Sequence, residues 1–354
     1  MTAGIRGART LVVGGAGFVG GNLVRMLLDA DVAEVVVVDN LLSSERSNVP
    51  TGGRVDFVEG SIVDDEVLSR LSERFDYVWH LACYHGNQSS IADPIADHMN
   101  NSLTSLKLFE HLSRGPMPEK VVYAAAGCAV AEKTYGDPAP TPEDAPVTMF
   151  HDSPYSISKI VGELYGNYYF RSAGLPFVKA RFQNVYGPGE ILGAGKWRGT
   201  PATVWRNVTP TFVWRALNGL PLRLDNGGQV SRDFINVRDV CRGLILCALR
   251  GESGEAYNLA SGRETMIIDL ARLVNTVTGN RAELEIAGSR PWDGSGRRFG
   301  STEKSRRDIG FSAEVDLRDG IEEMVRWTLD NRELIRACID RHADEMDEWS
   351  GSLV

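Results

Sequence analysis

The sequence has few cysteines, no excess of positive charge and no long apolar run, and each absence excludes a class of protein. Its five cysteines, at positions 83, 128, 241, 247 and 338, form no CxxC motif and no Cys/His spacing suited to zinc, so we expect reduced thiols and no metal. The net charge of −9 argues against a general nucleic-acid surface. No stretch approaches the roughly 20 apolar residues that span a bilayer, and the N-terminus lacks a signal-peptide core. The sequence therefore predicts a cytoplasmic protein that binds neither nucleic acid nor membrane.

What the sequence does contain is a regular alternation of short Val-rich runs and helical periods in its first half. The runs cover residues 10–14, 34–40, 55–61, 77–83, 120–126 and 177–187, and helices are expected over 18–29, 101–112 and 153–173. Short, continuously apolar strands separated by helices are typical of a parallel sheet that is buried on both faces. We expect an α/β fold with a Rossmann-type doubly wound parallel sheet.

The pattern becomes irregular after residue 187, which predicts a second, smaller domain. Residues 187–232 are rich in Gly, Pro and Trp, and the chain is expected to return to the sheet over 232–240 and 257–261 before a helical C-terminal portion. We therefore assign 1–186 and 233–262 to a nucleotide-binding domain, and 187–232 and 263–354 to a substrate-binding domain. Ligands of open α/β sheets bind at the strand C-termini, so the crevice between the two domains is the expected site.

The motif Gly14-Gly-Ala-Gly17-Phe-Val-Gly20 lies between the first strand and the first helix. Glycines there allow a tight turn, close approach of a pyrophosphate, and binding of that anion at the helix N-terminus. Asp39 ends the next strand 19 residues after Gly20, where a carboxylate accepts hydrogen bonds from an adenosine ribose. The pattern predicts a dinucleotide site, and the carboxylate favours NAD over NADP, although the nearby Arg46 leaves NADP open.

A second motif, Ser153-Pro-Tyr155-Ser-Ile-Ser-Lys159, places a tyrosine and a lysine one helical turn apart. Ser153 suits an N-cap and the proline suits the first helical position, so Tyr155 and Lys159 lie on one face of the helix. A lysine ammonium close to a tyrosine hydroxyl stabilises the phenolate, which can then act as a base near neutral pH. A surface Tyr/Lys pair is the alternative, and the preceding dinucleotide motif favours chemistry.

Several further motifs occur in order along nearly the whole chain. They are DN at 39–40, HLA at 80–82, NN at 100–101, RFQNVYGPG at 181–189, RDFINVRDV at 232–240 and YNLASG at 257–262. With the two motifs above, they make the sequence similar to the extended short-chain dehydrogenase/reductase family of NAD-dependent nucleotide-sugar epimerases and dehydratases. The run YAAAGC at 123–128 is most similar to that of GDP-mannose 3,5-epimerase-like members.

The resemblance implies tightly held NAD and oxidation at C4 of a nucleotide sugar, in which Tyr155 removes the O4 proton. It places cofactor contacts at Gly14, Gly17, Phe18, Val19, Gly20, Asp39, Asn40, Ser61, Ile62, Leu81, Ala82, Asn101, Tyr155 and Lys159. Ser61 departs from the family, which often has Asp there. The substrate's phosphates are expected at Asn184 and Arg232, and more loosely at Arg298, because the arginine fork suits phosphate oxygens.

The end of the strand at 120–126 departs from the family in a way that bears on the reaction. Relatives usually place a Ser or Thr hydroxyl near substrate O4 at the position of Ala126, which has none. Two residues later, Cys128 occupies the place where dehydratases carry a glutamate that removes the C5 proton. Once C4 is a ketone, the C5 hydrogen is acidic enough for a thiolate to remove. We expect Cys128 to be a C5 base; a small buried core residue is the alternative.

Epimerisation at C5 also needs an acid on the opposite face of the sugar. The loop at 190–210 offers Lys196, Arg198 and Arg206 as donors, and Lys196 is the candidate because arginine scarcely gives up a proton. His85 is a second candidate, since histidine titrates near neutrality. Trp197 and Trp205 in the same loop are expected either to stack on the nucleotide base or to pack the loop.

Three reactions therefore remain open from the sequence. The first is C5 epimerisation, with or without C3; the second is C4 epimerisation, with Cys128 structural; the third is dehydration. A non-catalytic nucleotide sensor is a fourth reading, which the missing hydroxyl at Ala126 keeps open. The resemblance implies a homodimer formed through the helices near 101–113 and 155–172. Neither the nucleotide nor the sugar is specified.

Overall fold

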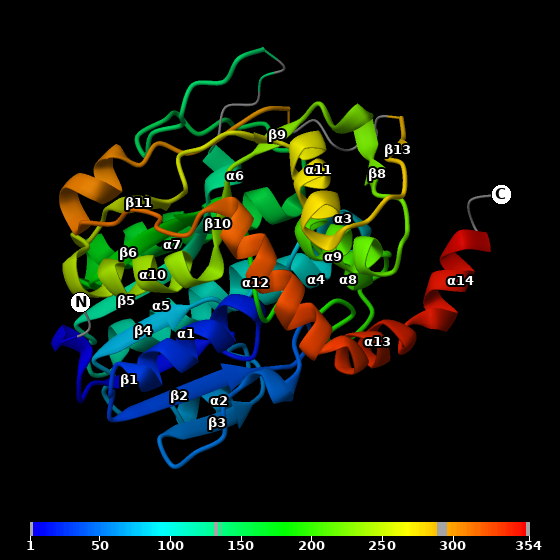
Figure 1. Ribbon diagram of the computed structural model, residues 1–354. Helices are drawn as coiled ribbons and strands as arrows, with labels where there is room; N and C mark the ends of the chain where they lie inside the picture. The colour runs from blue at the N-terminus through cyan, green and yellow to red at the C-terminus, as the bar shows by residue number, and fades with distance from the viewer. Residues whose placement is uncertain (1–2, 131–133, 135, 289–295, 352–354) are drawn as a thin grey trace.

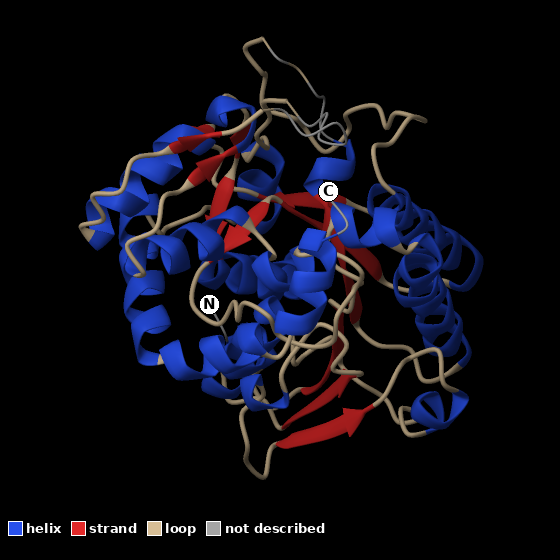
Figure 2. Cartoon of the chain, turned by 90° about the vertical axis from the view of Figure 1, so that its right-hand side faces the viewer, coloured by secondary structure: helices blue, strands red, loops and turns tan. Residues whose placement is uncertain are grey.

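The computed structural model describes residues 3–130, 134, 136–288 and 296–351. Its centre is a seven-stranded sheet of order β11-β6-β5-β4-β1-β2-β3 in which every neighbouring pair is parallel. Figure 2 shows the strands between two layers of helices. The strands are β1 Arg9–Val13, β2 Glu34–Asp39, β3 Val55–Glu59, β4 Tyr77–His80, β5 Lys120–Ala126, β6 Phe177–Phe182 and β11 Ala256–Leu259. The expected Rossmann-type α/β fold is confirmed.

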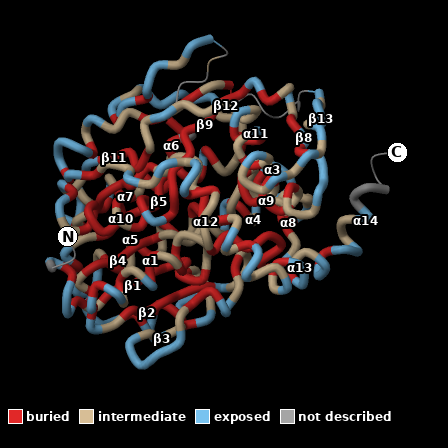
Figure 3. The backbone as a smooth tube through the Cα atoms, in the orientation of Figure 1, coloured by how far each residue is buried: buried red, intermediate tan, exposed pale blue. Residues whose placement is uncertain are grey.

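The Val-rich strands are apolar throughout because each face of the sheet has its own core. In β1, Val12 packs into one core, whereas Leu11 and Val13 pack into the other. Successive side chains of a strand point to opposite faces, so burial on both sides requires a continuous apolar run. Figure 3 shows the result as buried backbone along the central strands.

Helices cover both faces of the sheet. One face carries α1 Phe18–Asp29 and α10 Val237–Arg250, and the other carries α2 Asp65–Ser69, α5 Thr104–Arg114 and α7 Pro154–Ala173. Short helices α3 Asn87–Ala92 and α4 Pro94–Asp97 and the π-helix His98–Leu103 lead into α5, and α6 Gly127–Val130 follows β5. The predicted helices at 18–29 and 153–173 are therefore observed at almost the same bounds.

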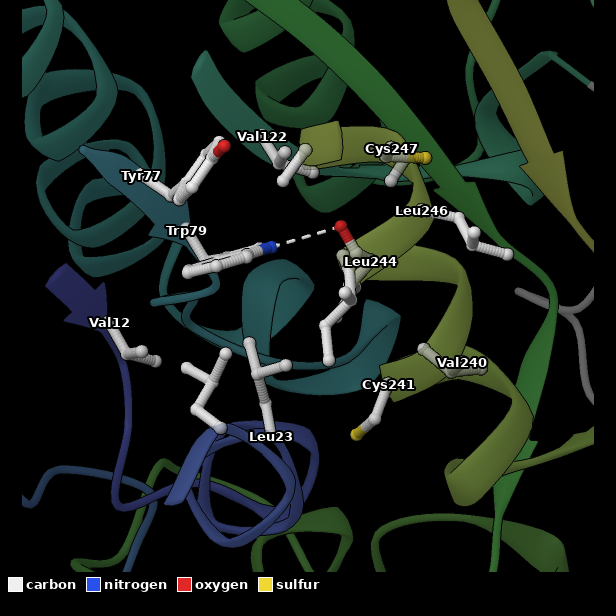
Figure 4. Packing of buried hydrophobic residues seen from close by; sticks show 14 of the residues in the cluster. Val12, Leu23, Tyr77, Trp79, Val122, Val240, Cys241, Leu244, Leu246 and Cys247 are labelled. Carbon is white, nitrogen blue, oxygen red and sulfur yellow. Dashed lines mark hydrogen bonds between the residues drawn. The ribbon is translucent and has the colours of Figure 1, made fainter. Parts of the chain in front are cut away.

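The first of the two cores is anchored by Trp79 of β4. Its ring is fully buried, and its indole N–H donates to the carbonyl of Leu244 in α10 at 3.1 Å (Figure 4). Buried tryptophan needs such a partner for its one polar atom. The contact fixes α10 against the sheet, with Cys241 and Cys247 packed in the same core.

The remaining elements form a smaller unit with a core of its own. Its helices are α8 Ala202–Trp205, α9 Val208–Leu217, α11 Ile267–Thr278, α12 Leu317–Asp330, α13 Arg332–Asp340 and α14 Ala343–Gly351, of which the last three run toward the C-terminus at the right of Figure 1. Its two-stranded sheets pair β7 Asn184–Tyr186 with β10 Phe234–Asn236, β9 Ser231–Arg232 with β12 Thr265–Met266, and β8 Arg223–Leu224 with β13 Glu285–Ile286.

One detail differs from the sequence-based expectation. Residues 234–236 do not rejoin the central sheet, because β10 pairs with β7 in a separate parallel ladder, and only β11 returns to the edge beside β6. The domain boundaries themselves stay a prediction. Among the described helices, none is long and apolar enough to cross a membrane, and no described group of His, Cys, Asp and Glu is arranged to hold a metal ion.

Candidate active site

A cavity of about 400 Å³ opens at the carboxyl ends of the central strands. Its lining comes from the turn after β1, the ends of β2, β4, β5 and β6, the start of α7, and the loop that leads to α9. Of the residues predicted from the sequence, it includes Gly14, Gly17, Phe18, Val19, Gly20, Asp39, Asn40, Ser61, Ile62, Leu81, Ala82, His85, Ala126, Tyr155, Lys159, Asn184 and Arg298. The fold thus gathers side chains that are almost 300 residues apart in the chain.

The glycine turn has no room for side chains. Gly14 has φ +86°, and a Cβ there would lie 2.4 Å from the backbone nitrogen of Ala82; at Gly20 a Cβ would lie 2.2 Å from the carbonyl oxygen of Gly14. The turn therefore brings bare backbone to the cavity, with the N-terminus of α1 beside it. Bare N–H groups at a helix N-terminus are what a pyrophosphate requires.

Asp39 lies at the end of β2 and faces the same cavity. One carboxylate oxygen accepts from the backbone N–H of Ala16 at 2.9 Å, and the other accepts from Leu41 N–H at 2.9 Å and from the Ser44 hydroxyl at 2.8 Å. Burial raises the pKa of Asp39, although these hydrogen bonds oppose the effect. The carboxylate is held in one orientation at the edge of the cavity, so the turn and Asp39 together fit a dinucleotide.

Tyr155 and Lys159 enter the cavity from the first turns of α7. Ser153 caps this helix by accepting the N–H of Ser156, and Pro154 follows at the first helical position, as expected. The ammonium of Lys159 donates to the carbonyl of Ala124 at 2.9 Å and lies 5.7 Å from the centre of the Tyr155 ring. This places a buried positive charge beside the tyrosine ring.

The position of α7 is fixed by a buried ion pair. Arg181 of β6 donates through two nitrogens to the two carboxylate oxygens of Glu163 at 2.9 and 2.8 Å, and its third nitrogen donates to the carbonyl of Glu143. Burial by itself would lower the pKa of Arg181, but the hydrogen bonds and the charge of Glu163 outweigh this effect, so the pKa of Arg181 is raised. The pair anchors the helix that carries Tyr155 to the sheet.

The alanine-rich end of β5 forms part of the cavity wall. Ala124, Ala125 and Ala126 all line the cavity, so the surface expected to face the sugar has no hydroxyl at this strand end. The backbone of Cys128 lies in α6, immediately after the strand. The Cys128 side chain lies outside what the structure describes, and its role as a base stays a prediction.

His85 lies against Tyr155 in the cavity lining, and it belongs to a short chain of polar contacts. The two rings are 6.1 Å apart, His85 Nε2 is 3.4 Å from Asn207 Oδ1, and Asn207 Nδ2 donates to Glu190 Oε1 at 2.5 Å. Because Asn207 donates to Glu190, its oxygen faces His85, and Nε2 carries the imidazole proton. Burial, with Arg198 and Arg206 nearby, lowers the pKa of His85 to about 4.

Glu190, at the end of this chain of contacts, is a buried carboxyl whose pKa is strongly raised. It is 3% exposed, and its second oxygen has no hydrogen-bond partner among the described residues. Burial raises its pKa to about 7, against the opposing effects of Asn207 and Arg206. Glu190 is therefore poised to gain or lose a proton near neutrality inside the cavity.

Four predicted residues lie away from the cavity lining. Lys196 is exposed and lines a separate hollow with Trp197 and Arg341, and Trp205 packs beside α9 and α13. Arg232 donates to the carbonyls of Ser231 and Gly296, and Asn101 holds the backbone of Tyr84 and the carboxylate of Asp97. The functional roles given to them stay predictions, but none of the four reaches the cavity in this conformation.

The structure adds cavity residues that sequence reasoning did not select. Glu190, Asn207, Gln183 and Ser43 line it, and Arg206, considered only as a weaker proton donor than Lys196, lines it too. Gln183 lies inside the RFQNVYGPG motif, so the sequence offered a signal by which it could have been selected as a site residue. Nothing in the sequence around Glu190 or Asn207 marks them as buried, because the loop that carries them has no periodic pattern.

Comparisons with known proteins agree with this geometry. Residues 10–260 match the model of the NAD-dependent epimerase/dehydratase family. A putative UDP-glucose 4-epimerase from Methanocaldococcus jannaschii is 30% identical over 91% of this chain and 98% of its own length, and a dTDP-glucose 4,6-dehydratase from Actinoplanes is 30% identical over 92% and 98%. The crystal structure of the Bordetella bronchiseptica enzyme WbmF with NAD⁺ and UDP is 54% identical, with a TM-score of 0.88 over 97% of this chain and 99% of that one.

Proposed function

The chain belongs to the NAD-dependent epimerase/dehydratase family, and from that premise we propose that it epimerises a nucleotide sugar at C5 through a transient 4-keto sugar. NAD⁺ held by the glycine turn and Asp39 would supply the hydride acceptor for oxidation at C4 and, in its reduced form, the hydride donor for the return step. The observation that carries the proposal is the meeting, in one cavity, of the glycine turn, Asp39, Tyr155 and Lys159. The following steps concern what this chain's own residues do.

Tyr155 is the proposed base for the O4 proton. Its ring lies in the cavity beside the Lys159 ammonium, which donates a hydrogen bond to the Ala124 carbonyl. The positive charge stabilises the phenolate that accepts the proton when C4 is oxidised, and Tyr155 returns this proton when C4 is reduced. Because Ala126 has no hydroxyl to hydrogen-bond to O4, Tyr155 acts on O4 without a second hydroxyl at this position.

Cys128 is the proposed base for the C5 proton. It follows Ala126 by two residues at the end of β5, the strand whose alanines line the cavity. The C4 ketone makes the C5 hydrogen acidic, so a thiolate in contact with it forms the enolate, and a proton delivered to the other face completes the inversion. The support for this role is sequence position and the apolar strand end, which offers no competing acid or base.

His85 is a better-placed second proton carrier than Lys196. It lines the cavity beside Tyr155, whereas Lys196 is exposed and lies outside that lining. With a pKa of about 4, His85 is neutral at pH 7. It must therefore take up a proton from solvent before it can protonate C5 on the face opposite Cys128, and its low pKa then makes the imidazolium a strong proton donor.

C4 epimerisation is the second candidate, because two of the relatives are described as UDP-glucose 4-epimerases. It needs Tyr155, Lys159 and NAD⁺ and leaves Cys128 without a chemical role. Dehydration is the third, supported by the dTDP-glucose 4,6-dehydratases among the relatives. UDP-sugars are the substrates to test first, since WbmF holds UDP.

The deciding experiment follows deuterium from solvent into the sugar. Purified protein with NAD⁺ is incubated in D₂O with UDP-hexoses, UDP-uronic acids and their amino-sugar forms, and the products are read by NMR and mass spectrometry. C5 epimerisation is expected to place deuterium at C5. An epimer without deuterium would make the protein a C4 epimerase, and loss of water would make it a dehydratase. Nucleotide binding without any turnover would favour the alternative that the protein is a non-catalytic nucleotide sensor.

Variants then assign the residues. Cys128→Ser is expected to abolish C5 exchange while hydride transfer from C4 stays detectable, and Tyr155→Phe is expected to abolish both. Cys247→Ala, in the core behind the sheet, is the matched control that should retain exchange. If Cys128→Ser exchanges at the wild-type rate, the thiol is not the base.

We also propose that the protein is a homodimer formed through α7 and the segment before α5. Ile157, Leu164 and Tyr168 are exposed along one face of α7, and Ile95 and Met99 are exposed beside it. An apolar stripe of this kind on a helix is typical of a subunit interface. Light scattering should give twice the chain mass, and Leu164→Glu should give the monomer. The cytoplasm stays the expected compartment.

A further inference from the structure

Two arginines of the segment between β7 and α9 form hydrogen bonds to the loop after β2. Arg198 Nη1 donates to the Ser43 hydroxyl at 2.7 Å, and Arg206 Nη2 donates to the Ser43 carbonyl at 2.8 Å and to the Ala194 carbonyl at 2.5 Å. Backbone contacts run alongside, because Lys196 N–H donates to the Leu42 carbonyl. The smaller unit is thereby tied to the loop that follows Asp39 and carries Ser44.

The hydrogen-bonding capacity of these arginines is only partly used. Arg198 is 3% exposed, yet its Nε and Nη2 have no partner among the residues that the structure describes, and neither has Arg206 Nε. No ion pair joins either guanidinium to a carboxylate within the same described part of the chain. Covered donors without partners are rare in folded proteins, because each loses its hydrogen bonds to water without replacement.

The backbone at Arg206 is also strained. Its φ of +46° and ψ of −102° lie outside the regions that a side chain with a Cβ ordinarily occupies. Such a conformation costs roughly 1–3 kcal/mol and persists where the surrounding structure requires the side chain to point in one direction. Here that direction brings the residue to the cavity wall, where Arg206 and its neighbour Asn207 both line it.

The electrostatics of the two guanidiniums are unfavourable without an anion. Burial and then the charge of Arg206 lower the pKa of Arg198 to about 10, and burial lowers that of Arg206. The groups that face Arg206 are Glu190, Glu45 and the thiols of Cys338 and Cys83. Glu45 is already paired with Arg341, and burial keeps Glu190 partly protonated near neutrality. Neither carboxyl offsets the charge in full.

The position of Arg206 identifies the anion. On one side it holds Ser43, close to Asp39 and so to the end of the cavity expected for adenosine; on the other side the adjacent Asn207 meets His85, which lies against Tyr155 at the reacting end. A dinucleotide that spans these two ends has its pyrophosphate between them. The glycine turn and Arg206 line the same cavity, so both could meet that pyrophosphate.

We propose that Arg206, supported by Arg198 through Ser43, binds the pyrophosphate of the dinucleotide and closes the smaller unit over it. This inference rests on the NAD⁺ assignment of the proposed function and adds a ligand contact from outside the nucleotide-binding fold. The fork of a guanidinium suits two phosphate oxygens, and a dry site strengthens the pairing. A cofactor closed over in this way is retained between turnovers, as a reaction that returns its own hydride requires.

The test compares ligands with and without a pyrophosphate. Protein freed of carried-over cofactor is titrated with NAD⁺, ADP-ribose and adenosine by calorimetry, with no sugar present. Arg206→Gln is expected to weaken NAD⁺ and ADP-ribose by about tenfold or more, the size of one lost charge-assisted hydrogen bond or more, and adenosine by less than about twofold. Arg215→Gln, the same charge change on α9 away from the cavity, should alter none of the three.

Each outcome decides the proposal. Equal losses for adenosine and ADP-ribose would mean that Arg206 only shapes the loop, and an unchanged affinity for ADP-ribose would also overturn the contact. If Arg206→Gln does not fold, Arg206→Lys decides, because it keeps the charge and should still lose ADP-ribose affinity several-fold relative to adenosine. If the wild-type protein binds no NAD⁺ at all, the proposed function is refuted as well. If the wild-type protein binds NAD⁺ and the Arg206 variant binds it equally tightly, only the Arg206 contact is refuted.

Discussion

The two walls of the cavity differ in how completely their polar groups are satisfied by the protein itself. On the sheet side, the Asp39 carboxylate has three donors from the protein, and the Lys159 ammonium has a carbonyl. On the loop side, Glu190, Arg198 and Arg206 each keep at least one buried polar atom without a partner in the described chain. The sheet side is complete before a ligand arrives, whereas the loop side is stabilised by one.

This difference distinguishes the groups that support the fold from the groups that are available to contact a ligand. A satisfied buried group contributes to folding, and its loss is felt with or without ligand. An unsatisfied one costs folding free energy and returns it on binding, so its removal is expected to stabilise the free protein and weaken the complex. Glu190 and Asp39, two buried carboxyls in one cavity, allow this contrast to be tested with opposite signs.

The largest effect is expected at Asp39. Asp39→Ala leaves the N–H groups of Ala16 and Leu41 and the Ser44 hydroxyl without their acceptor, at about 1–3 kcal/mol for each buried donor. The substitution also relieves the desolvation that raises the pKa of Asp39, so we expect a net loss of about 3–5 kcal/mol of unfolding free energy. Urea denaturation of the NAD⁺-free protein measures it. Asp56→Ala, at an exposed site on β3, is the control. A loss below 1 kcal/mol would show that the sheet side is not self-sufficient.

Glu190→Gln is expected to act in the opposite direction and to depend on pH. The pKa of Glu190 is raised from 4.5 to about 7, so the folded state binds more protons than the unfolded state between these values and loses stability as pH rises through them. The deficit is about 3 kcal/mol above pH 7. The variant should therefore be more stable than wild type at pH 8, with most of the gain gone at pH 5. A constant difference across that range would contradict the assignment.

A smaller pH effect is expected from His85. Burial and the two arginines lower its pKa from 6.5 to about 4, so the unfolded state binds the extra proton first and stability falls as pH drops from 6.5 toward 4. His85→Gln should remove about 1–2 kcal/mol of that decline between pH 7 and pH 5. Thermal unfolding in a pH series measures it, with His98→Gln at an exposed position as the control. An unchanged slope would indicate that His85 is solvated.

The smallest effect is expected at Lys196. Lys196→Met removes a side chain that is exposed and outside the cavity lining, so the rate of C5 deuterium exchange should stay within about twofold of wild type. The same assay on His85→Gln should show a loss of about 10²-fold or more if His85 carries the second proton. A large loss at Lys196 instead would mean that its loop rearranges over the bound sugar.

Local patterns in the sequence were sufficient for the sheet side of the cavity. The Val-rich runs, the glycines that no side chain could replace, and the capped helix of Tyr155 and Lys159 each express a short-range requirement: a period, a turn or an N-terminus. These features sit within a few residues of one another, so the sequence alone predicted the doubly wound sheet, the bounds of α1 and α7, and most of the cavity lining that is proposed to meet the dinucleotide. The same reasoning identified the missing hydroxyl at Ala126.

Tertiary structure decided the loop side. Residues 187–207 have no period, so nothing in the sequence distinguished exposed Lys196 from buried Arg198 and Arg206, or marked Glu190 as a carboxyl with a raised pKa. Burial, and the field of charges from segments far away in the chain, exist only once the loop has folded against the strand ends. A residue's type and spacing follow from the sequence, but its desolvation and its partners follow from which distant segments cover it, and these set the chemistry at that side of the cavity.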